Sequence, residues 1–163
     1  MSDKIKSYFE RDRFAAFVGA KLVEVKPGYA KAMLEISDKH LNAADIVQGG
    51  VTFTLADLAF AAASNSHGQV SLGVNANISY FRPPKGKILV AEAKEISITN
   101  KLANYNIDVF DENREHIARL TGMVYRKKEM IESDWFSVCY NSLITRLLFL
   151  FVNKMLKSAE LIQ

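Results

Sequence analysis

The sequence lacks most features that would direct a chain to a membrane or to an oxidising compartment. Cys139 is the only cysteine, so no disulfide can form within the chain, and a lone thiol is typical of reducing compartments. No apolar run reaches the roughly 18 residues of a transmembrane helix. Residues 1–10 are charged and lack the apolar core of a signal peptide. These absences predict a cytoplasmic protein.

The sequence also lacks the charge patterns of nucleic-acid binding and the ligand patterns of metal binding. The net charge is +3, and basic and acidic residues are interleaved, so there is no continuous basic stripe. The short cluster at residues 126–128 is interpreted as a solvated strand end, with a phosphate contact as the alternative. His40, His67 and His116 are dispersed without metal-ligand spacing, which predicts no metal site.

The spacing of apolar residues divides the chain into a sheet domain, residues 1–130, and a helical extension, residues 131–163. The first part is predicted to contain a short helix, a hairpin, a loop, a long apolar helix and four more strands. Their expected ranges are 7–18, 19–26 and 29–36, 38–48, 51–63, then 70–81, 87–98, 102–110 and 117–126. This order predicts an α+β fold in which an antiparallel sheet wraps around one central helix.

Two helical patterns flank the sheet domain. In residues 7–18, Phe9, Phe14, Phe17 and Val18 are expected to share one face of a single helix. In the extension, apolar residues recur at helical spacing and predict a helix over 142–157. Packing against protein is the favoured fate of that helix, and contact with a membrane surface is the alternative.

One carboxylate stands alone in the apolar middle of the chain. Between residues 46 and 81, Asp57 is the only formally charged residue, and it falls in the middle of the long apolar helix. Asp is unfavourable inside helices, and burying an unpaired carboxylate costs several kcal/mol in proteins. Asp57 is therefore a candidate catalytic residue, and a structural Asp bonded to nearby backbone is the alternative.

Gln48, Gly49 and Gly50 stand at the predicted start of the same helix. The first amides of a helix have no partner inside the helix, and they carry the positive end of its dipole. They can bind an anion or the developing oxyanion of an acyl transfer. The alternative is that the two glycines only allow a tight turn.

The spacing between these two features has a consequence for assembly. Gly50 and Asp57 are seven residues apart and share a helix face, but they stand roughly 10 Å apart along the axis. Both cannot touch one scissile carbonyl from within one chain. If both act, a second subunit must supply one of them, as an antiparallel pairing of two such helices would do.

Several motifs resemble the phenylacetyl-CoA thioesterase (PaaI-type) family of hot-dog proteins. They are His40-Leu41-Asn42, the run from Gln48 to Phe60 that contains Leu55-Ala56-Asp57, then Asn65-Ser66, and Tyr80-Phe81-Arg82-Pro83. The resemblance covers about residues 14–128. It implies a hot-dog fold that pairs into dimers and usually tetramers, with a site at the subunit interface that needs no cofactor or metal.

The resemblance also implies roles for individual residues. Asp57 would be the general base or the nucleophile, the amide of Gly49 or Gly50 would polarise the thioester carbonyl, and Asn42 would orient the water or the substrate. The family usually has His before the two glycines, where this chain has Gln48. Gln can form hydrogen bonds but cannot titrate.

Further residues are candidates for substrate binding. Asn65 and Ser66 could contact the acyl group or the pantetheine, with capping of the helix as the alternative. Arg82 and Lys85, beside Pro83, could bind the phosphates of CoA, with loop solubility as the alternative.

The sequence predicts hydrolysis of acyl-CoA thioesters with an aryl-acetyl, aroyl or medium-chain acyl group. A non-catalytic acyl-CoA-binding module is the first alternative, and Gln48 is the residue that favours it. A hot-dog hydratase or dehydratase is the second, but it requires an Asp and His pair on the helix, and no His lies between His40 and His67.

Overall fold

The computed structural model describes residues 2–131, and the predicted helix over 142–157 lies outside this range. The described chain forms one compact unit that ends at Ile131. Its elements, in order, are α1 (Ser2–Phe9), α2 (Arg13–Val18), β1 (Lys21–Lys26), β2 (Tyr29–Glu35), the 3-10 turn η1 (Asp38–His40), α3 (Gly49–Asn65), β3 (Gln69–Tyr80), β4 (Ile88–Ile98), β5 (Leu102–Asp111) and β6 (His116–Met130).

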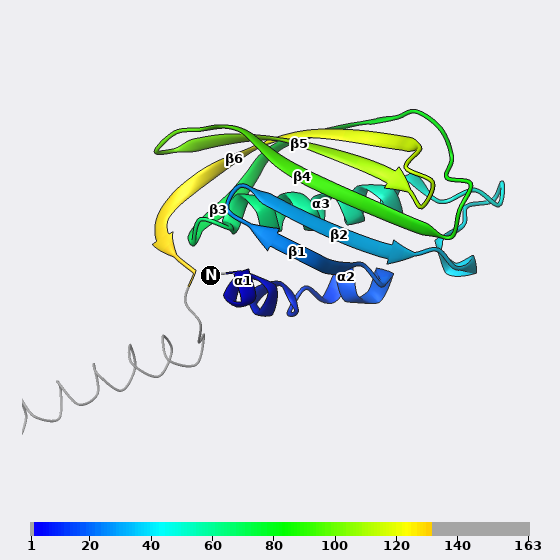
Figure 1. The fold of residues 1–163 in the computed structure, drawn as a ribbon, viewed down its shortest axis with the longest axis horizontal. Coiled ribbons are helices and arrows are strands. Elements are labelled where there is room, and N and C mark those ends of the chain that lie inside the picture. The colour runs from blue at the N-terminus through cyan, green and yellow to red at the C-terminus, as the bar shows by residue number, and fades with distance from the viewer. Residues whose placement is uncertain (1, 132–163) are drawn as a thin grey trace, which may run out of the picture. The chain divides into compact units, whose positions relative to one another are not determined.

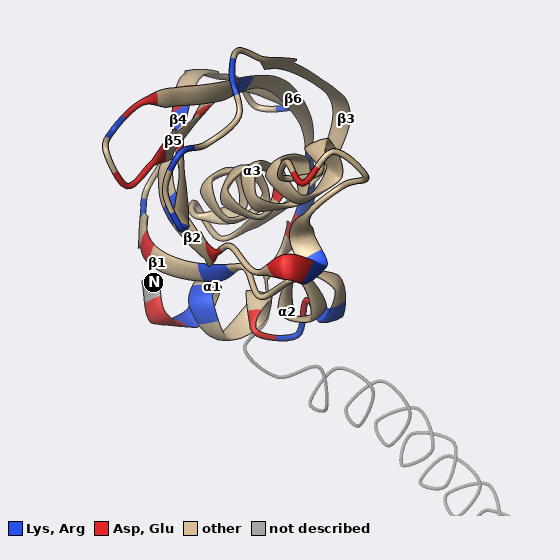
Figure 2. Cartoon of the chain, turned by 90° about the vertical axis from the view of Figure 1, so that its right-hand side faces the viewer, with Lys and Arg blue, Asp and Glu red and all other residues tan. Residues whose placement is uncertain are grey.

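The strands form a single antiparallel sheet in the order β1-β2-β4-β5-β6-β3. The sheet curves around α3, and α1 and α2 lie beside β1 below it (Figure 1). Figure 2, turned by 90°, shows the sheet enclosing α3, while charged residues gather on the surrounding elements. The predicted α+β architecture is confirmed. Among the described residues, no helix is long and apolar enough to cross a membrane.

Small side chains allow α3 to lie close to the sheet. The buried face of α3 is rich in alanine, and the facing strands β2 and β4 bury alanines at alternate positions. These alanines are Ala56, Ala59, Ala62 and Ala63 on α3, Ala30 and Ala32 on β2, and Ala91 and Ala93 on β4. Close packing in a protein interior leaves little space, so these small residues fix the distance between helix and sheet. This contact helps to set which face of α3 is turned toward the sheet.

The single helix expected over residues 7–18 is wrong, because the structure has two helices there. The first helix ends at Phe9, and Asp12 caps α2, since its Oδ1 accepts hydrogen bonds from the amides of Phe14 (3.1 Å) and Ala15 (2.9 Å). The expected shared apolar face is wrong as well. Val18 is buried, but the side chains of Phe14 and Phe17 are 63% and 74% exposed.

The strand β3 forms one edge of the sheet and pairs only with β6. It is 12 residues long and contains no Asp, Glu, Lys or Arg. Most of its residues from Leu72 onward are exposed, including Leu72 and Val74. Proteins usually protect such edges with charges or with a covering element, and β3 has none of these charges.

Candidate functional site

The start of α3 is fixed by hydrogen bonds. Gln48 has extended backbone angles, and its side-chain Oε1 accepts a hydrogen bond from the amide of Gly50. The Gln48 carbonyl oxygen accepts from the amide of Val51 at 2.9 Å. Within residues 2–131, the amide of Gly49 has no hydrogen-bond partner. The helix therefore begins with one first-turn amide capped and one amide open.

The two glycines at the helix start lie close to neighbouring side chains. A Cβ added to Gly49 would lie 3.2 Å from the ring of Tyr80, and a Cβ added to Gly50 would lie 2.7 Å from Oε1 of Gln48. The Tyr80 hydroxyl donates a hydrogen bond to the Gly49 carbonyl oxygen at 2.9 Å. The helix start is thus bound to the end of β3, and larger residues would displace Tyr80 or the Gln48 cap.

Asp57 lies two turns further along the helix. Unlike the groups at the helix start, its carboxylate is not held by a hydrogen bond from another side chain of the described residues. Its neighbours Ala56 and Leu58 are buried, but the Asp57 side chain is exposed in the single chain. Although the side chain is exposed, the packed groups beside it remove part of the water around the carboxylate and raise its pKa, and the carboxylate of Asp12 raises that pKa further. Among residues 2–131, Asp57 has no ion pair and no hydrogen bond from a side chain. The carboxylate is therefore free to bind a molecule outside this chain.

A cavity of about 270 Å³ adjoins Asp57. Its walls come from α1, α3, β3 and β6. The lining residues are Tyr8, Phe9, Asp57, Phe60, Ala61, Ser64, Asn65, Val70, Ser71, Leu72, Gly73 and Val124. Phe60 is buried against the backbone, since a Cβ on Gly122 would lie 2.7 Å from its ring. The carboxylate thus faces a largely apolar space that ends at the exposed strand β3.

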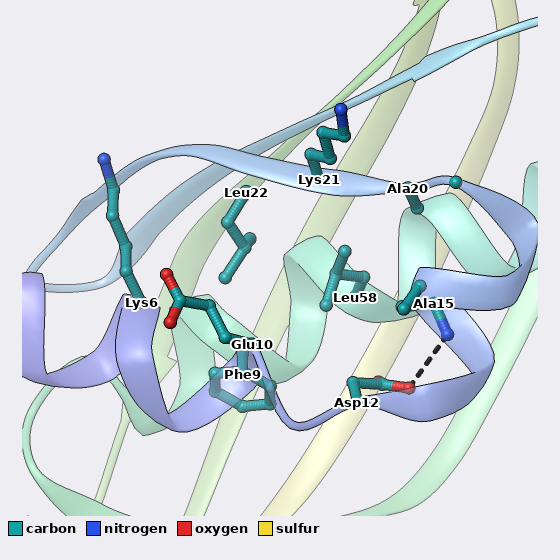
Figure 3. A pocket seen from close by; sticks show the side chains of 11 residues that line it. Lys6, Phe9, Glu10, Asp12, Ala15, Ala20, Lys21, Leu22 and Leu58 are labelled. Atoms are coloured by element: carbon teal, nitrogen blue, oxygen red, sulfur yellow. Dashed lines mark hydrogen bonds between the residues drawn. The ribbon is translucent and has the colours of Figure 1, made fainter.

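A second cavity, of about 440 Å³, lies between α1, α2 and β1 (Figure 3). Asp12 and Leu58 are both among its lining residues, and Figure 3 shows the Asp12 carboxylate bonded to Ala15. The α2 cap therefore lies beside the residue that follows Asp57 on α3. Sequence reasoning missed Asp12, although Asp followed by a short apolar segment is a recognisable helix-start pattern.

Asn42 shapes the loop that leads into α3. Its Oδ1 accepts hydrogen bonds from the amides of Ala44 (2.9 Å) and Ile46 (3.2 Å). The amide of Gln48 donates to the His40 carbonyl oxygen at 2.8 Å, so this loop closes on itself directly before the helix. The Asn42 side-chain nitrogen donates to no group among the described residues. That nitrogen is available to a water or a substrate.

The hydrogen bonds of Asn65 and Ser66 favour the capping alternative. Both residues are buried. Asn65 exchanges hydrogen bonds with the backbone of Ser71, at 2.9 Å and 3.2 Å. The Ser66 hydroxyl donates to the Ala63 carbonyl oxygen and accepts from the amide of Gly28, both at 2.7 Å. These residues connect the end of α3 to β3 and to the β1–β2 turn, although Asn65 also lines the Asp57 cavity.

Arg82, Pro83 and Lys85 lie in the segment that follows β3. Arg82 forms an ion pair with Glu115 at 2.7 Å, and the backbone amide of Lys85 donates to the buried Asp111 at 3.4 Å. The bond between Tyr80 and Gly49 holds the beginning of this segment at the start of α3. The cations therefore belong to the same end of the molecule as Gly49, not to the neighbourhood of Asp57.

The basic cluster at residues 126–128 has a structural role at Arg126. Its guanidinium donates hydrogen bonds to the Thr99 carbonyl oxygen at 2.6 Å and to the Gln69 side chain.

Among the residues that the structure describes, no group of His, Cys, Asp and Glu could hold a metal ion. Of the dispersed histidines, His40 is buried in the η1 turn.

Comparison with known proteins finds thioesterases and esterases. Residues 45–118 match the model of the thioesterase superfamily. A relative named "Putative esterase" in Archaeoglobus fulgidus is 42% identical over 79% of this chain and 85% of that protein. The acyl-coenzyme A thioesterase PaaI of Escherichia coli K12 is 28% identical over 72% of this chain and 85% of that protein.

The fold is also similar to solved structures. The E. coli PaaI protein, from the phenylacetic acid degradation operon, superposes with a TM-score of 0.76 and 25% identity over 80% of this chain and 95% of that one. A Streptococcus mutans protein solved bound to acetyl CoA has a TM-score of 0.64 and 20% identity, over 68% of this chain and 90% of that one. At that identity the second likeness shows the fold alone.

Proposed function

We propose, since this chain belongs to the PaaI-type hot-dog thioesterases of the thioesterase superfamily, that it hydrolyses acyl-CoA thioesters with Asp57 as the catalytic carboxylate. It is an enzyme of thioester hydrolysis, in line with the name of its relative PaaI. The single observation that carries the role of Asp57 is its unpartnered carboxylate, which faces a cavity from the middle of a buried helix.

The proposed reaction begins with attack on the thioester carbonyl carbon. With Asp57 as general base, the carboxylate takes a proton from a water molecule, and the water oxygen forms the new bond to carbon. With Asp57 as nucleophile, its oxygen attacks first, and water then hydrolyses the resulting anhydride. In both routes the C–S bond breaks and CoA leaves as the thiol or thiolate. The raised pKa of Asp57 supports the base role, because a more basic carboxylate accepts a proton more readily.

The amide of Gly49 is the proposed donor to the developing oxyanion. It is the open first-turn amide of α3, whereas Gln48 caps the amide of Gly50. An oriented donor at a helix start stabilises negative charge on the carbonyl oxygen as the transition state forms. Gln48 fixes this end of the helix and takes no proton. Asn42 would orient the water or the substrate through its side-chain nitrogen.

The proposed active site is shared between two subunits. Gly49 and Asp57 lie on one helix, and about 1.5 Å of rise per residue separates them by more than about 10 Å. Asp57 of one chain would therefore act together with Gly49 of another. The exposed, charge-free edge of β3, which also lines the Asp57 cavity, supports pairing at this side of the molecule. A cytoplasmic homodimer or homotetramer is the expected assembly.

Arg82 and Lys85 are the proposed contacts of the CoA phosphates. They lie in the segment held near Gly49 by Tyr80. Arg82 would exchange Glu115 for a phosphate, since their exposed ion pair contributes little stability. The name of the E. coli relative, acyl-coenzyme A thioesterase PaaI, supports the choice of ligand. The acyl group is expected to be of the aryl-acetyl, aroyl or medium-chain class.

A second candidate function is acyl-CoA binding without turnover, and Gln48 is the observation that favours it. Where the family has a His that can titrate, this chain has a residue that can only form hydrogen bonds. Release of free thiol from a panel of aryl-acetyl, aroyl and medium-chain CoA esters separates the two functions. Turnover of one class is expected. Tight binding of these esters without any thiol release would replace hydrolysis by binding.

A further inference from the structure

An apolar cleft of about 480 Å³ lies between α2, η1 and the first two turns of α3. It is separate from the Asp57 cavity and from the cavity in Figure 3. Its lining residues are Phe14, Phe17, Val18, Lys39, His40, Leu41, Gln48, Gly50, Val51, Phe53 and Thr54. This volume falls within the range of about 300–1,000 Å³ that is usual for small-molecule sites, whereas the Asp57 cavity is smaller.

The walls of this cleft are fixed by polar contacts. The ammonium of Lys39 donates a hydrogen bond to the Phe17 carbonyl oxygen at 3.0 Å and lies 5.9 Å from the centre of the Phe17 ring. The buried ring of His40 donates through Nε2 to the Val18 carbonyl oxygen at 2.8 Å and accepts from the Ser37 amide at 3.0 Å. Together these bonds hold α2 against η1, so the cleft is formed before any ligand arrives.

Two aromatic rings are exposed at the cleft. Phe14 and Phe17 stack with ring centres 6.5 Å apart, and both side chains are mostly exposed to solvent. Both rings therefore keep apolar surface in water beside an apolar cavity. Exposed apolar surface gathered in this way marks a site of interaction.

The cleft reaches the start of α3. Gln48 and Gly50 are among its lining residues, and they flank the Gly49 amide. A group whose carbonyl oxygen meets that amide can place its apolar part directly into the cleft. Lys39 is the only formally charged lining residue, and its ammonium is already engaged by Phe17. An uncharged group is therefore favoured.

We infer that this cleft receives the acyl group of the thioester, and that Phe14 and Phe17 set a preference for uncharged acyl chains of medium length. The inference rests on the proposed function, because that function brings the thioester carbonyl to Gly49. The apolar stacked rings would cover the methylene groups of the chain, and each methylene removed from water contributes a factor of about four in affinity.

The test compares acyl-CoA esters from acetyl to decanoyl with the double variant Phe14→Ala, Phe17→Ala. The loss of kcat/KM should grow with chain length, from less than about twofold for acetyl-CoA to about tenfold or more for decanoyl-CoA. The variant Phe14→Leu, Phe17→Leu keeps apolar surface and should keep most of the length preference. Ile96→Ala, which removes an exposed apolar side chain on β4, is the matched control and should leave the preference unchanged.

An equal loss on every chain length, or no loss on the long chains, would overturn the inference. A second measurement keeps it separate from the proposed function. Binding of S-decyl-CoA, a thioether that cannot be hydrolysed, is measured by calorimetry for the wild-type protein and for the double alanine variant. If the wild-type protein hydrolyses no ester, the proposed function fails, but weaker thioether binding by the alanine variant still supports the acyl cleft. Equal thioether binding by the two proteins contradicts it.

Discussion

The start and the middle of α3 differ in how their polar groups are satisfied. At the start, the Gln48 side chain caps Gly50, Tyr80 holds the Gly49 carbonyl, and one amide is left open in a fixed direction. In the middle, the Asp57 carboxylate has no partner among residues 2–131 and lies exposed beside a largely apolar cavity. The first arrangement suits a donor that must not move, and the second suits a carboxylate that must act on another molecule.

The largest expected effect comes from removing the carboxylate in the middle of the helix. Asp57→Asn should lower kcat by roughly a hundredfold or more, the scale of a positioned acid-base group. The assembly should be intact by size-exclusion chromatography. A variant with near-wild-type turnover would remove Asp57 from the mechanism.

The same variant should be at least as stable as the wild-type protein at neutral pH. The pKa of Asp57 is raised in the folded protein, so the folded state binds more protons than the unfolded state between the two pKa values. Stability therefore falls as the pH rises through that window, and the neutral amide introduced by Asp57→Asn would remove this cost. The advantage in Tm of the variant should disappear at a pH below the unfolded pKa of the carboxyl.

The next prediction concerns whether Gly49, at the start of α3, and Asp57, in its middle, act from different subunits. Gly49 is the first residue of α3, where proline is tolerated, so Gly49→Pro would remove the proposed oxyanion donor itself and should inactivate the site, as Asp57→Asn does. Co-expression of the two variants with different tags yields mixed dimers with one complete site out of two. Their activity should return to about half of the wild-type value if Gly49 and Asp57 come from different chains. Mixed dimers as inactive as their parents would place both residues in one chain.

Gln48 is expected to have a smaller effect, because it orients groups and carries no proton. Gln48→Ala removes the side chain that caps Gly50, which should cost about 1 kcal/mol of stability and reduce kcat by several fold. Gln48→His should change kcat only modestly. Steady-state kinetics and thermal melting measure both effects, and a large gain with His would mean that this chain has lost a catalytic group and acts as a binder.

The pH dependence of kcat/KM tests the influence of Asp12 on Asp57. The Asp12 carboxylate contributes, after burial, to the raised pKa of Asp57. Asp12→Asn keeps an effective helix cap but removes this charge, so the pKa of Asp57 should fall. The acid limb of the pH profile of kcat/KM should then move to lower pH. An unmoved limb, in a variant that still melts normally, would show that Asp12 has no influence on the base.

The smallest effect on activity is expected from removing residues 132–163. None of the proposed site residues lies in that segment, and Ile131 should be kept because it is buried and its amide donates to the Gly68 carbonyl oxygen at 2.7 Å. The truncated protein should retain kcat/KM within about twofold, with a lower Tm or an altered oligomer. An unchanged assembly and Tm, together with lost sedimentation on anionic liposomes, would support the membrane alternative for the predicted helix.

The sequence predicted the sheet and the central helix because their apolar periods are regular. Asp57 was identifiable for a related reason, since it interrupts a long stretch that has no other charge. The break at residues 10–12 was missed because Phe9, Phe14 and Val18 fit one helical period, and the cap at Asp12 outweighs that pattern.

Hydrogen bonds between residues far apart in the chain could not be predicted from the sequence. The hydroxyl of Ser66 accepts from Gly28, 38 residues earlier in the chain, and nothing local marks that bond. The bond from Tyr80 to Gly49 spans 31 residues and was missed for the same reason. Each of these contacts depends on which strands become neighbours, which is decided by packing of the whole sheet.

If a second copy pairs along the uncharged edge of β3, as proposed, the folding of this chain depends on its concentration. In a protomer alone, the outer backbone groups of this strand and its apolar side chains face water. A second copy that covers them binds only the folded form, so it shifts the folding equilibrium by mass action. The temperature of unfolding should therefore rise with protein concentration, and dilution should weaken both the fold and a site built from two copies.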